Sequence, residues 1–189
     1  MVERRTVIRR GFHTLSSLFV VYYWLPDYIE VLDLTKQAVA VLGLSLIAGF
    51  EAYRIHKGWV FLGLRDYERK WIAGYFWGAF GYVIALLVFP PQFAIITILG
   101  TTLVDPVLGE MRTSRFRRYG RPVGFVLWCA VAATCGALVQ PAAPYFLIPV
   151  GAAIAVGVEA VKVRRVDDNF VMNIVPLLCL TAIARVLGL

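Results

Sequence analysis

The sequence has little charge for its length. Only 16% of its 189 residues are Asp, Glu, Lys or Arg, whereas 60% are hydrophobic. Soluble domains average about 25% charged and about 45–50% apolar residues, so this chain has too few charges to cover a soluble globule. The same composition argues against a disordered or fibrous chain. The net charge of +7 does not indicate a nucleic-acid binder, because the basic residues lie between long apolar runs, as in loops that face a negative membrane surface.

Common phosphate-binding motifs are also missing. The chain contains neither G-x-x-x-x-G-K-[ST] nor G-x-G-x-x-G, which argues against a P-loop or a protein-kinase site. Its three cysteines all lie within apolar runs, so no disulfide framework is expected. There is no linker or low-complexity tract, and we expect a single transmembrane domain over residues 1–189.

Long apolar runs are what the sequence does have. About 20 helical residues cross the hydrocarbon core of a bilayer, at about 1.5 Å each. Seven runs reach or approach that length and predict an all-α integral membrane protein, a polytopic bundle of seven transmembrane helices. The runs are 11–26, 36–54, 71–89, 92–105, 122–140, 144–161 and 170–188. The first and the fourth are short, so six spans is the main rival count.

The basic residues alternate along these runs. All but two of the 19 Lys and Arg fall before the first run or just after the second, fourth and sixth; the exceptions are Lys36 and Arg185. Cytoplasmic loops carry the excess of Lys and Arg. The N-terminus is therefore predicted to be cytoplasmic and the C-terminus extracytoplasmic, in the cell membrane if the source is a prokaryote.

Ionisable residues gather near the ends that are predicted to be cytoplasmic. None lies in the middle of a run, where a proton- or ion-coupled transporter usually needs one, so a small transporter or lipid flippase is the less favoured alternative. A ring of polar groups at one membrane face suits an enzyme that brings a water-soluble substrate to a lipid headgroup. The ring contains His13, Glu51, Asp105, Glu159, Asp167, Asp168 and Asn169.

Two kinds of charge in this region predict phosphate chemistry. Carboxylate and amide oxygens are hard ligands suited to Mg²⁺, and arginine side chains match the geometry of phosphate oxygens. A metal ion together with cationic side chains on a nucleotide is the usual means of stabilising phosphoryl transfer. The sequence therefore favours a magnesium-dependent reaction of a nucleoside triphosphate with a membrane lipid.

Four short elements follow one another along the chain. They are residues 9–16 (RRGFHTLS), 68–74 (ERKWIAG), 103–109 (LVDPVLG), and Glu159 with 167–175 (DDNFVMNIV). Their order and content resemble the polyprenol kinase superfamily, which includes dolichol kinase, phytol kinase and CTP-dependent diacylglycerol kinase. The corresponding family elements open with R-K-x-x-H-x-x-x-G, include G-D-x-x-A and close with E…D-N-x-x-x-P. The resemblance implies a helical membrane enzyme that uses CTP and Mg²⁺ to phosphorylate a lipid alcohol.

The chain departs from the family pattern at three places. Val104 precedes the motif aspartate where the family has glycine, and Asn173 stands about where the family often has proline. The arginine-rich segment 117–124 shows no clear K-[ST]-x-E-G. The last departure concerns the nucleotide, so the preference for CTP over ATP is left to experiment.

The resulting hypothesis is a CTP-dependent lipid kinase that phosphorylates a long-chain isoprenoid alcohol, dolichol-like or polyprenol-like, at the cytoplasmic interface. The candidate catalytic residues are Asp105, Glu51 and Glu159, and the candidate Mg²⁺ ligands are Asp105, Asp167, Asp168 and Glu110. The candidates for nucleotide binding are Arg117, Arg118, Arg121, Gly109 and Asn169, and those for the lipid substrate are Arg10 and His13. The enzyme alternative is a CTP-using cytidylyltransferase that makes a CDP-lipid from a lipid phosphate. The oligomeric state stays open, a homodimer included.

Several of these assignments have a structural alternative. Asp105 also fits an ion pair with an arginine at a helix end, and Glu51 an i,i+3 ion pair with Arg54. Asp167 and its neighbours fit the N-cap of the last helix. His13 fits a hydrogen-bonded interfacial histidine. The arginine-rich loop also fits a role in topology and in contact with anionic lipid alone.

Overall fold

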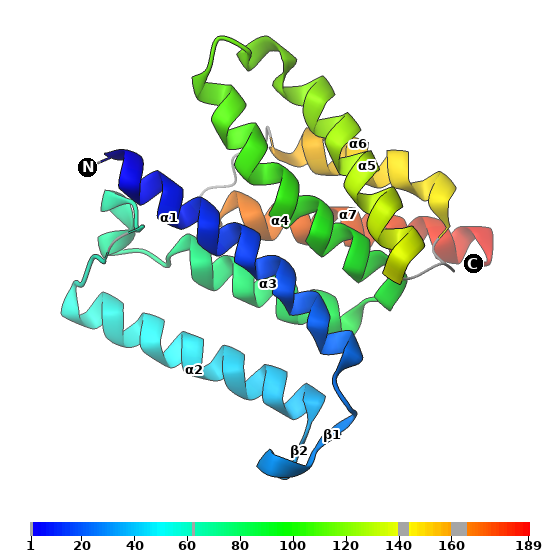
Figure 1. The fold of residues 1–189 in the computed structure, drawn as a ribbon. Helices are drawn as coiled ribbons and strands as arrows, with labels where there is room; N and C mark the ends of the chain where they lie inside the picture. The colour runs from blue at the N-terminus through cyan, green and yellow to red at the C-terminus, as the bar shows by residue number, and fades with distance from the viewer. Residues whose placement is uncertain (1, 62, 140–143, 160–165) are drawn as a thin grey trace.

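The computed structural model describes residues 2–61, 63–139, 144–159 and 166–189, where the chain is all-α apart from one hairpin whose two strands have two residues each (Figure 1). Four stretches in these residues are helical, long and apolar enough to cross a membrane, which indicates a multi-pass membrane protein. They are Lys36–Lys57, Pro91–Met111, Arg117–Leu138 and Asp168–Leu187. Helices over Gly74–Val88 and Tyr145–Glu159 are apolar but shorter. The predicted basic connection with Lys162, Arg164 and Arg165 lies outside the described residues.

The described residues form seven α-helices, in agreement with the number of apolar runs. They are α1 (Val2–Leu15), α2 (Lys36–Lys57), α3 (Gly74–Val88), α4 (Pro91–Thr113), α5 (Gly120–Val139), α6 (Ile148–Glu159) and α7 (Asp168–Leu187). Strands β1 (Tyr28–Ile29) and β2 (Leu34–Thr35) pair antiparallel, with Tyr28 opposite Thr35. The 3-10 segments are η1 (Ser16–Trp24), η2 (Glu30–Leu32), η3 (Asp66–Arg69), η4 (Arg117–Tyr119) and η5 (Tyr145–Leu147).

Two elements differ from the predicted runs. The run 11–26 is not one α-helix, because α1 ends at Leu15 and η1 follows it; arginine is a good helix former, so the helix begins before the apolar stretch. The run 92–105 was predicted to end at Asp105, but α4 continues through Pro106 to Thr113. A proline inside a helix removes one backbone hydrogen bond. Val104 and Leu108 on either side of it are both 2% exposed, so packing holds the helix together there.

The ends of α2 and α7 follow the rules for helix termini. The hydroxyl of Thr35 accepts a hydrogen bond from the backbone N–H of Ala38, and Gly58 ends α2 in the left-handed conformation at φ 64°. The carboxylate of Asp167 accepts a hydrogen bond from the N–H of Asn169 at 3.1 Å. The alternative that Asp167 caps the last helix is thus confirmed.

The core lies where α4 meets α5, α6 and α7. Trp128 of α5 is 1% exposed and occupies a space left by two glycines on the neighbouring helices. A Cβ atom on Gly100 of α4 would lie 2.4 Å from its Nε1, and one on Gly151 of α6 would lie 3.0 Å from its Cη2. Such close approach through small residues is typical of helix packing in membranes.

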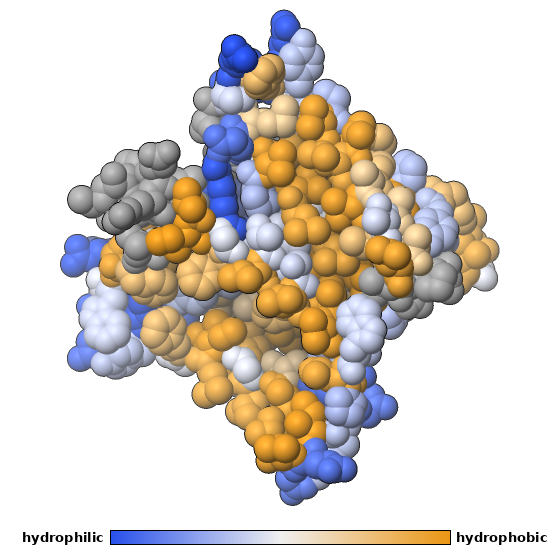
Figure 2. Space-filling view, in the orientation of Figure 1, coloured by the Kyte–Doolittle hydropathy of each residue, from blue (hydrophilic) through white to orange (hydrophobic). Residues whose placement is uncertain are grey.

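Helix α2 lies apart from this core, with its main contacts to α3 and to β2 (Figure 1). Leu46, in the middle of α2, is 67% exposed, whereas Glu51 and Arg54 near its end are buried. An exposed apolar face is the expected state of a helix that borders lipid. Figure 2 shows this apolar surface hollowed between α2 and α1.

The helices bring polar ends together at one end of the bundle. The beginnings of α1, α3 and α7 lie there with the ends of α2 and α4 (Figure 1). Most of the polar residues that the sequence assigned to one membrane face lie at these helix ends, whereas Glu159 ends α6. The fold gathers His13, Asp105, Asp167, Asp168 and Asn169 around one common space.

Candidate functional site

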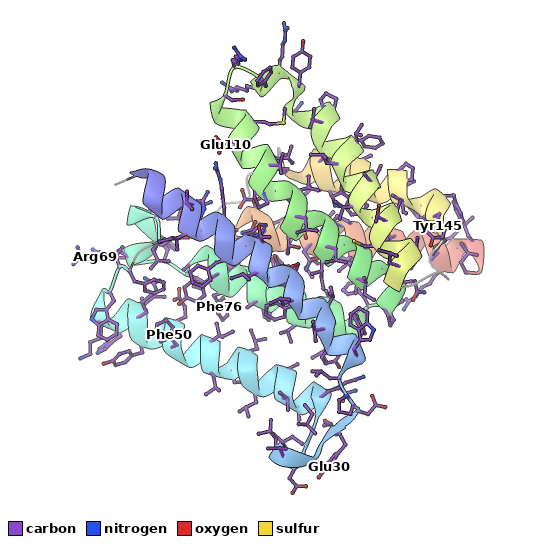
Figure 3. The ribbon with its side chains drawn as sticks, in the orientation of Figure 1. Glu30, Phe50, Arg69, Phe76, Glu110 and Tyr145 are labelled. Carbon is purple, nitrogen blue, oxygen red and sulfur yellow. The ribbon has the colours of Figure 1, made fainter. Side chains whose placement is uncertain are left out.

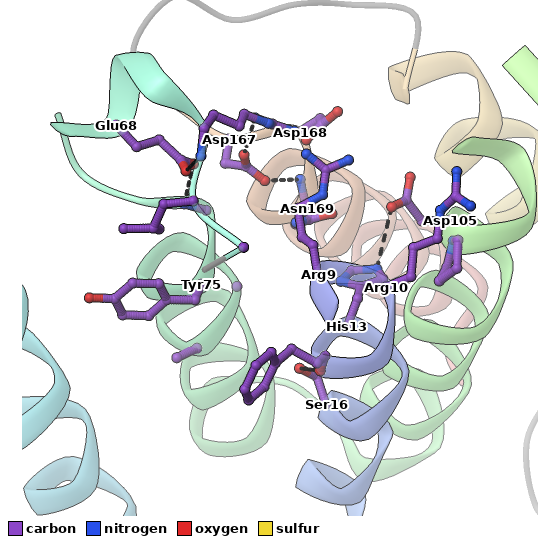
Figure 4. A pocket seen from close by; sticks show the side chains of 18 of the residues that line it. Arg9, Arg10, His13, Ser16, Glu68, Tyr75, Asp105, Asp167, Asp168 and Asn169 are labelled. Atoms are coloured by element: carbon purple, nitrogen blue, oxygen red, sulfur yellow. Dashed lines mark hydrogen bonds and ion pairs between the residues drawn. The ribbon is translucent and has the colours of Figure 1, made fainter. Parts of the chain in front are cut away.

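A cavity of about 470 Å³ lies among α1, α2, α3, α4 and α7 at this end of the bundle (Figure 4). Its size is within the usual range of ligand sites, about 300–1,000 Å³. One side of its lining is polar and the other is aromatic and aliphatic. The polar side consists of Arg9, Arg10, His13, Ser16, Arg65, Glu68, Asp105, Asp167, Asp168 and Asn169.

Helix α1 supplies three basic side chains to the cavity. Figure 4 shows Arg9 extending toward Asn169 and Arg10 extending toward Asp105. Arg10 also pairs with Glu110 of α4. His13, one turn after Arg9, faces the same space because residues i and i+4 share a helix face. The last turns of α1 therefore place two arginines and a histidine between α7 and α4.

His13 and Asp105 form a loose pair. The Nε2 atom of His13 lies 3.5 Å from Oδ2 of Asp105, and their side chains are 11% and 24% exposed. This separation exceeds the usual N–H···O distance of about 2.7–3.2 Å. Within the described part of the chain, Nε2 of His13 is buried without a hydrogen-bond partner. The pair thus has an imidazole nitrogen and a carboxylate facing one another at the cavity.

Arg65 and Asp167 form the second charged pair. The Nη1 atom of Arg65 donates to Oδ2 of Asp167 at 3.1 Å, and the carboxylate is only 5% exposed. Burial raises the pKa of Asp167 to about 7, the adjacent Asp168 carboxylate adds to the rise, and the Arg65 guanidinium opposes it. Burial disfavours the charge on Arg65, but the Asp167 carboxylate, the Tyr67 hydroxyl and the Asp168 carboxylate together outweigh it, so the pKa of Arg65 is raised. One guanidinium thus faces two neighbouring carboxyl groups.

The connection before α3 is folded around Glu68. Glu68 as a whole residue is only 4% exposed. Its carboxylate accepts hydrogen bonds from the backbone N–H groups of Arg65, at 2.7 Å, and Gly74, at 2.9 Å. A Cβ atom on Gly74 would lie 2.9 Å from Oδ2 of Asp167. The first residue of α3 therefore has to be small for the Asp167 carboxylate to lie against it.

Glu51 and Arg54 lie behind the cavity and do not line it. Glu51 accepts hydrogen bonds from Nε and Nη2 of Arg54 at 2.6 and 2.8 Å, from the N–H of Ala73 at 2.7 Å and from the hydroxyl of Tyr75. Arg54 also donates to the carbonyl groups of Trp59 and Trp71. The structural alternative for Glu51, an i,i+3 ion pair, is confirmed. This pair ties the segment between α2 and α3 to the end of α2.

The cavity brings together part of the predicted site. It is lined by the predicted residues Arg10, His13, Asp105, Gly109, Asp167, Asp168 and Asn169. The predicted residues outside its lining are Glu51, Glu110, Glu159, Arg117, Arg118 and Arg121. Figure 3 labels Glu110 on α4.

The three arginines assigned to the nucleotide are exposed at the connection between α4 and α5. The guanidinium of Arg118 lies over the ring of Tyr119, 4.6 Å from its centroid, a cation–π contact at the surface. Glu159 ends α6. The three arginines and Glu159 therefore lie outside the cavity.

Sequence reasoning did not select Arg9, Arg65, Glu68 or Tyr75, all of which line the cavity. Arg9 had a signal, because it precedes Arg10 in the family-like first element. Glu68 had one too, because it opens the family-like second element, whereas Arg65 had none of its own, since it became part of the site through its contact with Asp167.

The metal prediction rests on a small set of carboxylates. Among the residues that the structure describes, no group of three or more His, Cys, Asp or Glu side chains is arranged to hold a metal ion. Asp167 and Asp168 nevertheless supply adjacent carboxyl oxygens at the cavity. Magnesium is commonly held by one or two carboxylates, with phosphate and water oxygens completing its coordination, so these residues fit a metal that arrives with a nucleotide.

Comparison with known proteins leaves the family open. No protein-family model, no curated protein and no solved structure matches the chain.

Proposed function

We propose that this protein is a lipid kinase that transfers the terminal phosphate of a nucleoside triphosphate to the hydroxyl of a long-chain isoprenoid alcohol. The observation that carries the proposal is the division of one cavity into a charged side and an apolar side. A triphosphate needs cations and hydrogen-bond donors, and a hydrocarbon chain needs apolar surroundings. A lipid alcohol kinase has to bind both at once. The resemblance to the polyprenol kinase superfamily favours CTP as the nucleotide.

The proposed orientation places the cavity at the cytoplasmic membrane face. The distribution of Lys and Arg supports seven spans with the N-terminus inside, and the cavity lies at the ends of the helices that these basic connections join. A nucleotide would then reach the cavity from the cytoplasm. The lipid would reach it from the membrane.

The arginines of the cavity are the proposed phosphate ligands. Arg9, Arg10 and Arg65 come from two separate segments and line the same space, where their guanidinium groups can share the oxygens of a triphosphate. They take the place of Arg117 and Arg118 in this role. Neutralising charge on the phosphoryl oxygens is the main task of such side chains in phosphoryl transfer.

Asp167 and Asp168 are the proposed ligands of Mg²⁺. Asp167 and Asp168 are adjacent carboxyl groups at the cavity, and Asp167 is buried, so a cation beside them would relieve their repulsion. Bound there with the nucleotide, Mg²⁺ would supply positive charge to the phosphate oxygens. Activity should vanish in EDTA and return with Mg²⁺, and full activity in EDTA would exclude this role.

His13 and Asp105 are the proposed acceptors of the proton. The lipid oxygen forms a bond to the terminal phosphorus while the bond from that phosphorus to the bridging oxygen of the nucleotide breaks. The hydroxyl proton passes to the His13–Asp105 pair, and the nucleoside diphosphate leaves with the electrons of the broken bond. A base has to lie within hydrogen-bond reach of the proton that it takes, and this pair lies on the lining of the cavity.

The test is to follow two labels of CTP with purified protein and an isoprenoid alcohol or its phosphate. A kinase transfers a label on the γ-phosphate to the alcohol and releases CDP. A cytidylyltransferase transfers a label on the α-phosphate to the lipid phosphate and releases pyrophosphate. A transporter or flippase transfers neither label. The absence of any labelled lipid would therefore contradict the proposal.

A pair of variants links the activity to the cavity. Arg9→Ala should lower transfer by about 10²-fold, a typical loss for one group that stabilises transition-state charge. Arg117→Ala is the matched control, because Arg117 is exposed outside the cavity, and it should leave transfer within about twofold. Equal losses in the two variants would place the nucleotide at the α4–α5 connection instead.

A further inference from the structure

The apolar side of the cavity is formed by three separate parts of the chain. Phe12 of α1 and Phe19 of η1 form one wall, Ile47 and Phe50 of α2 form the opposite wall, and Ala79 of α3 lies between them. We call this space the α1–α2 groove. Figure 2 shows a hollow between α2 and α1 on an apolar face of the molecule, and Figure 3 marks Phe50 on α2.

Helix α2 is held at its two ends. At one end the carboxylate of Glu51 and the guanidinium of Arg54 join it to the segment before α3. At the other end Lys36 lies 2.8 Å from Asp27. Between these points Leu46 is exposed and the main contacts of α2 are with α3. The middle of the helix therefore leaves the groove open along its length.

The groove is amphipathic from one end to the other. Its closed end carries the charged groups of the cavity, and its open side lies along α2, which is one of the helices long enough to cross a membrane. An occupant must have a polar head that meets the charges and an apolar part that meets the phenylalanines. In a bilayer the molecule with this form and this access is a lipid.

The size of the cavity decides how much of that lipid is enclosed. A space of about 470 Å³ is that of a site for a drug-sized ligand, far less than a long isoprenoid chain fills. The enclosed part is therefore the hydroxyl end and the first portion of the chain. The remainder has to lie outside, among the lipids that border α1 and α2.

We propose that the chain of the lipid substrate lies in the α1–α2 groove and leaves it sideways into the bilayer, between α1 and α2. This inference rests on the proposed function for the chemistry at the hydroxyl end. It adds that the protein binds the hydroxyl end and the first part of the chain, and that the length of the remainder has little effect on the reaction.

The test measures lipid binding without any nucleotide. A long isoprenoid alcohol that carries a photoreactive diazirine near its hydroxyl is irradiated with the purified full-length protein in lipid nanodiscs. Ile47→Trp fills the groove, and its matched control is Leu46→Trp, one residue away on α2 and outside the cavity lining. Labelling should fall at least about fivefold in Ile47→Trp, as expected for overpacking of a fitted site, and stay within about twofold in Leu46→Trp.

A second variant guards against misfolding. Ile47→Cys is purified and then blocked with a bulky thiol reagent, and Leu46→Cys is treated in the same way. The peptides that carry the diazirine photolabel should come from residues 12–19 and 47–50. Equal labelling of the two blocked variants, or label mapped to other helices, overturns the inference.

Chain length gives an independent readout of turnover. A series of isoprenoid alcohols longer than the groove should be phosphorylated with kcat/KM values within about twofold of one another, because no further chain is bound. A steady rise with chain length overturns the inference while leaving the kinase in place. Photolabelling in the groove without any phosphate transfer has the opposite meaning: the lipid site stands and the proposed reaction fails.

Discussion

The guanidinium of Arg65 lies 3.1 Å from the carboxylate of Asp167, although 102 positions separate the two residues in the chain. The contact joins the segment before α3 to the first turn of α7. Arg65 lines the cavity, and the contact places it beside the proposed metal ligands. The charged side of the cavity depends on this contact for its shape.

At a pH above about 7, where the Asp167 carboxyl is ionised, Arg65→Ala should destabilise the protein, because it leaves that carboxylate buried beside Asp168 without its cation. A hydrogen bond to a charged group contributes about 1.5–3 kcal/mol to the free energy of unfolding, and a loss near the lower end of that range is expected for this partly exposed arginine. Thermal unfolding in detergent measures it. In an Asp167→Asn background, Arg65→Ala should lower the free energy of unfolding by clearly less. Equal losses in both backgrounds would show that the two side chains do not interact.

The stability of the protein should depend on the charge of Asp167. Its pKa is about 7 in the folded chain and about 3.9 when unfolded, so the folded state keeps a proton that the unfolded state has released. The stability that this retained proton contributes to the folded state is therefore lost as pH rises from about 4 to about 7. Asp167→Asn has no such proton, so its melting temperature relative to wild type should rise across this window in metal-free buffer.

Asp27→Asn is the control for this pH experiment. Asp27 is exposed, and its hydrogen bond with Lys36 lowers the pKa of its carboxyl group, so its titration window lies below about 4. Its melting temperature relative to wild type should stay flat between pH 4 and 7. An advantage of Asp167→Asn that shrinks as pH rises would show that the Asp167 carboxyl is charged at the acidic end of the window.

Asp105→Asn should slow turnover by about 10²-fold or more, which is about 2.7 kcal/mol of barrier at 1.36 kcal/mol per decade. The amide keeps the shape of the side chain but removes the charge that faces His13. Because the side chain is 24% exposed, the loss of stability should be small, about 0–1 kcal/mol. Melting temperature and turnover are measured on the same preparation, with Asp27→Asn as the control. A variant that melts like wild type and keeps more than about a third of its turnover removes Asp105 from the reaction.

Arg54→Met should destabilise the protein by about 3–5 kcal/mol, because it leaves Glu51 as an uncompensated buried charge. The double substitution Glu51→Leu with Arg54→Met should recover much of this loss, since a buried ion pair is often replaced by apolar residues at little net cost. Lys57→Met on the same helix, at an exposed position, should stay within about 0.5 kcal/mol. If Arg54→Met unfolds like the Lys57 control, the pair does not hold α2 to the segment before α3.

Topology is tested with reporter fusions. A reporter after Leu189 should be extracytoplasmic, and one inserted at the exposed connection near Arg117 should be cytoplasmic, because the basic residues are retained inside. A cytoplasmic reading at Leu189 would favour six spans.

The sequence predicted the helices and part of the cavity because both are encoded locally. Apolar runs predict helices, and the pattern of charges between them predicted that His13, Asp105 and Asp167 would lie at one end of the bundle. Arg65 could not be predicted, since its role comes from a contact with Asp167. Composition alone assigned Arg117 to the nucleotide, but that residue is exposed at the connection between α4 and α5. The length of α4 was missed because packing carries the helix through Pro106.

Helix α2 is fastened at both ends and loosely packed between them, and this has a consequence for how the protein can diversify. Substitutions along its middle change few buried contacts, so they should cost little free energy of unfolding. The positions that border the groove are therefore free to vary without loss of the fold. Under the proposed function, substitutions at these positions would change the lipid that the groove accepts, while the charged end of the cavity stays the same.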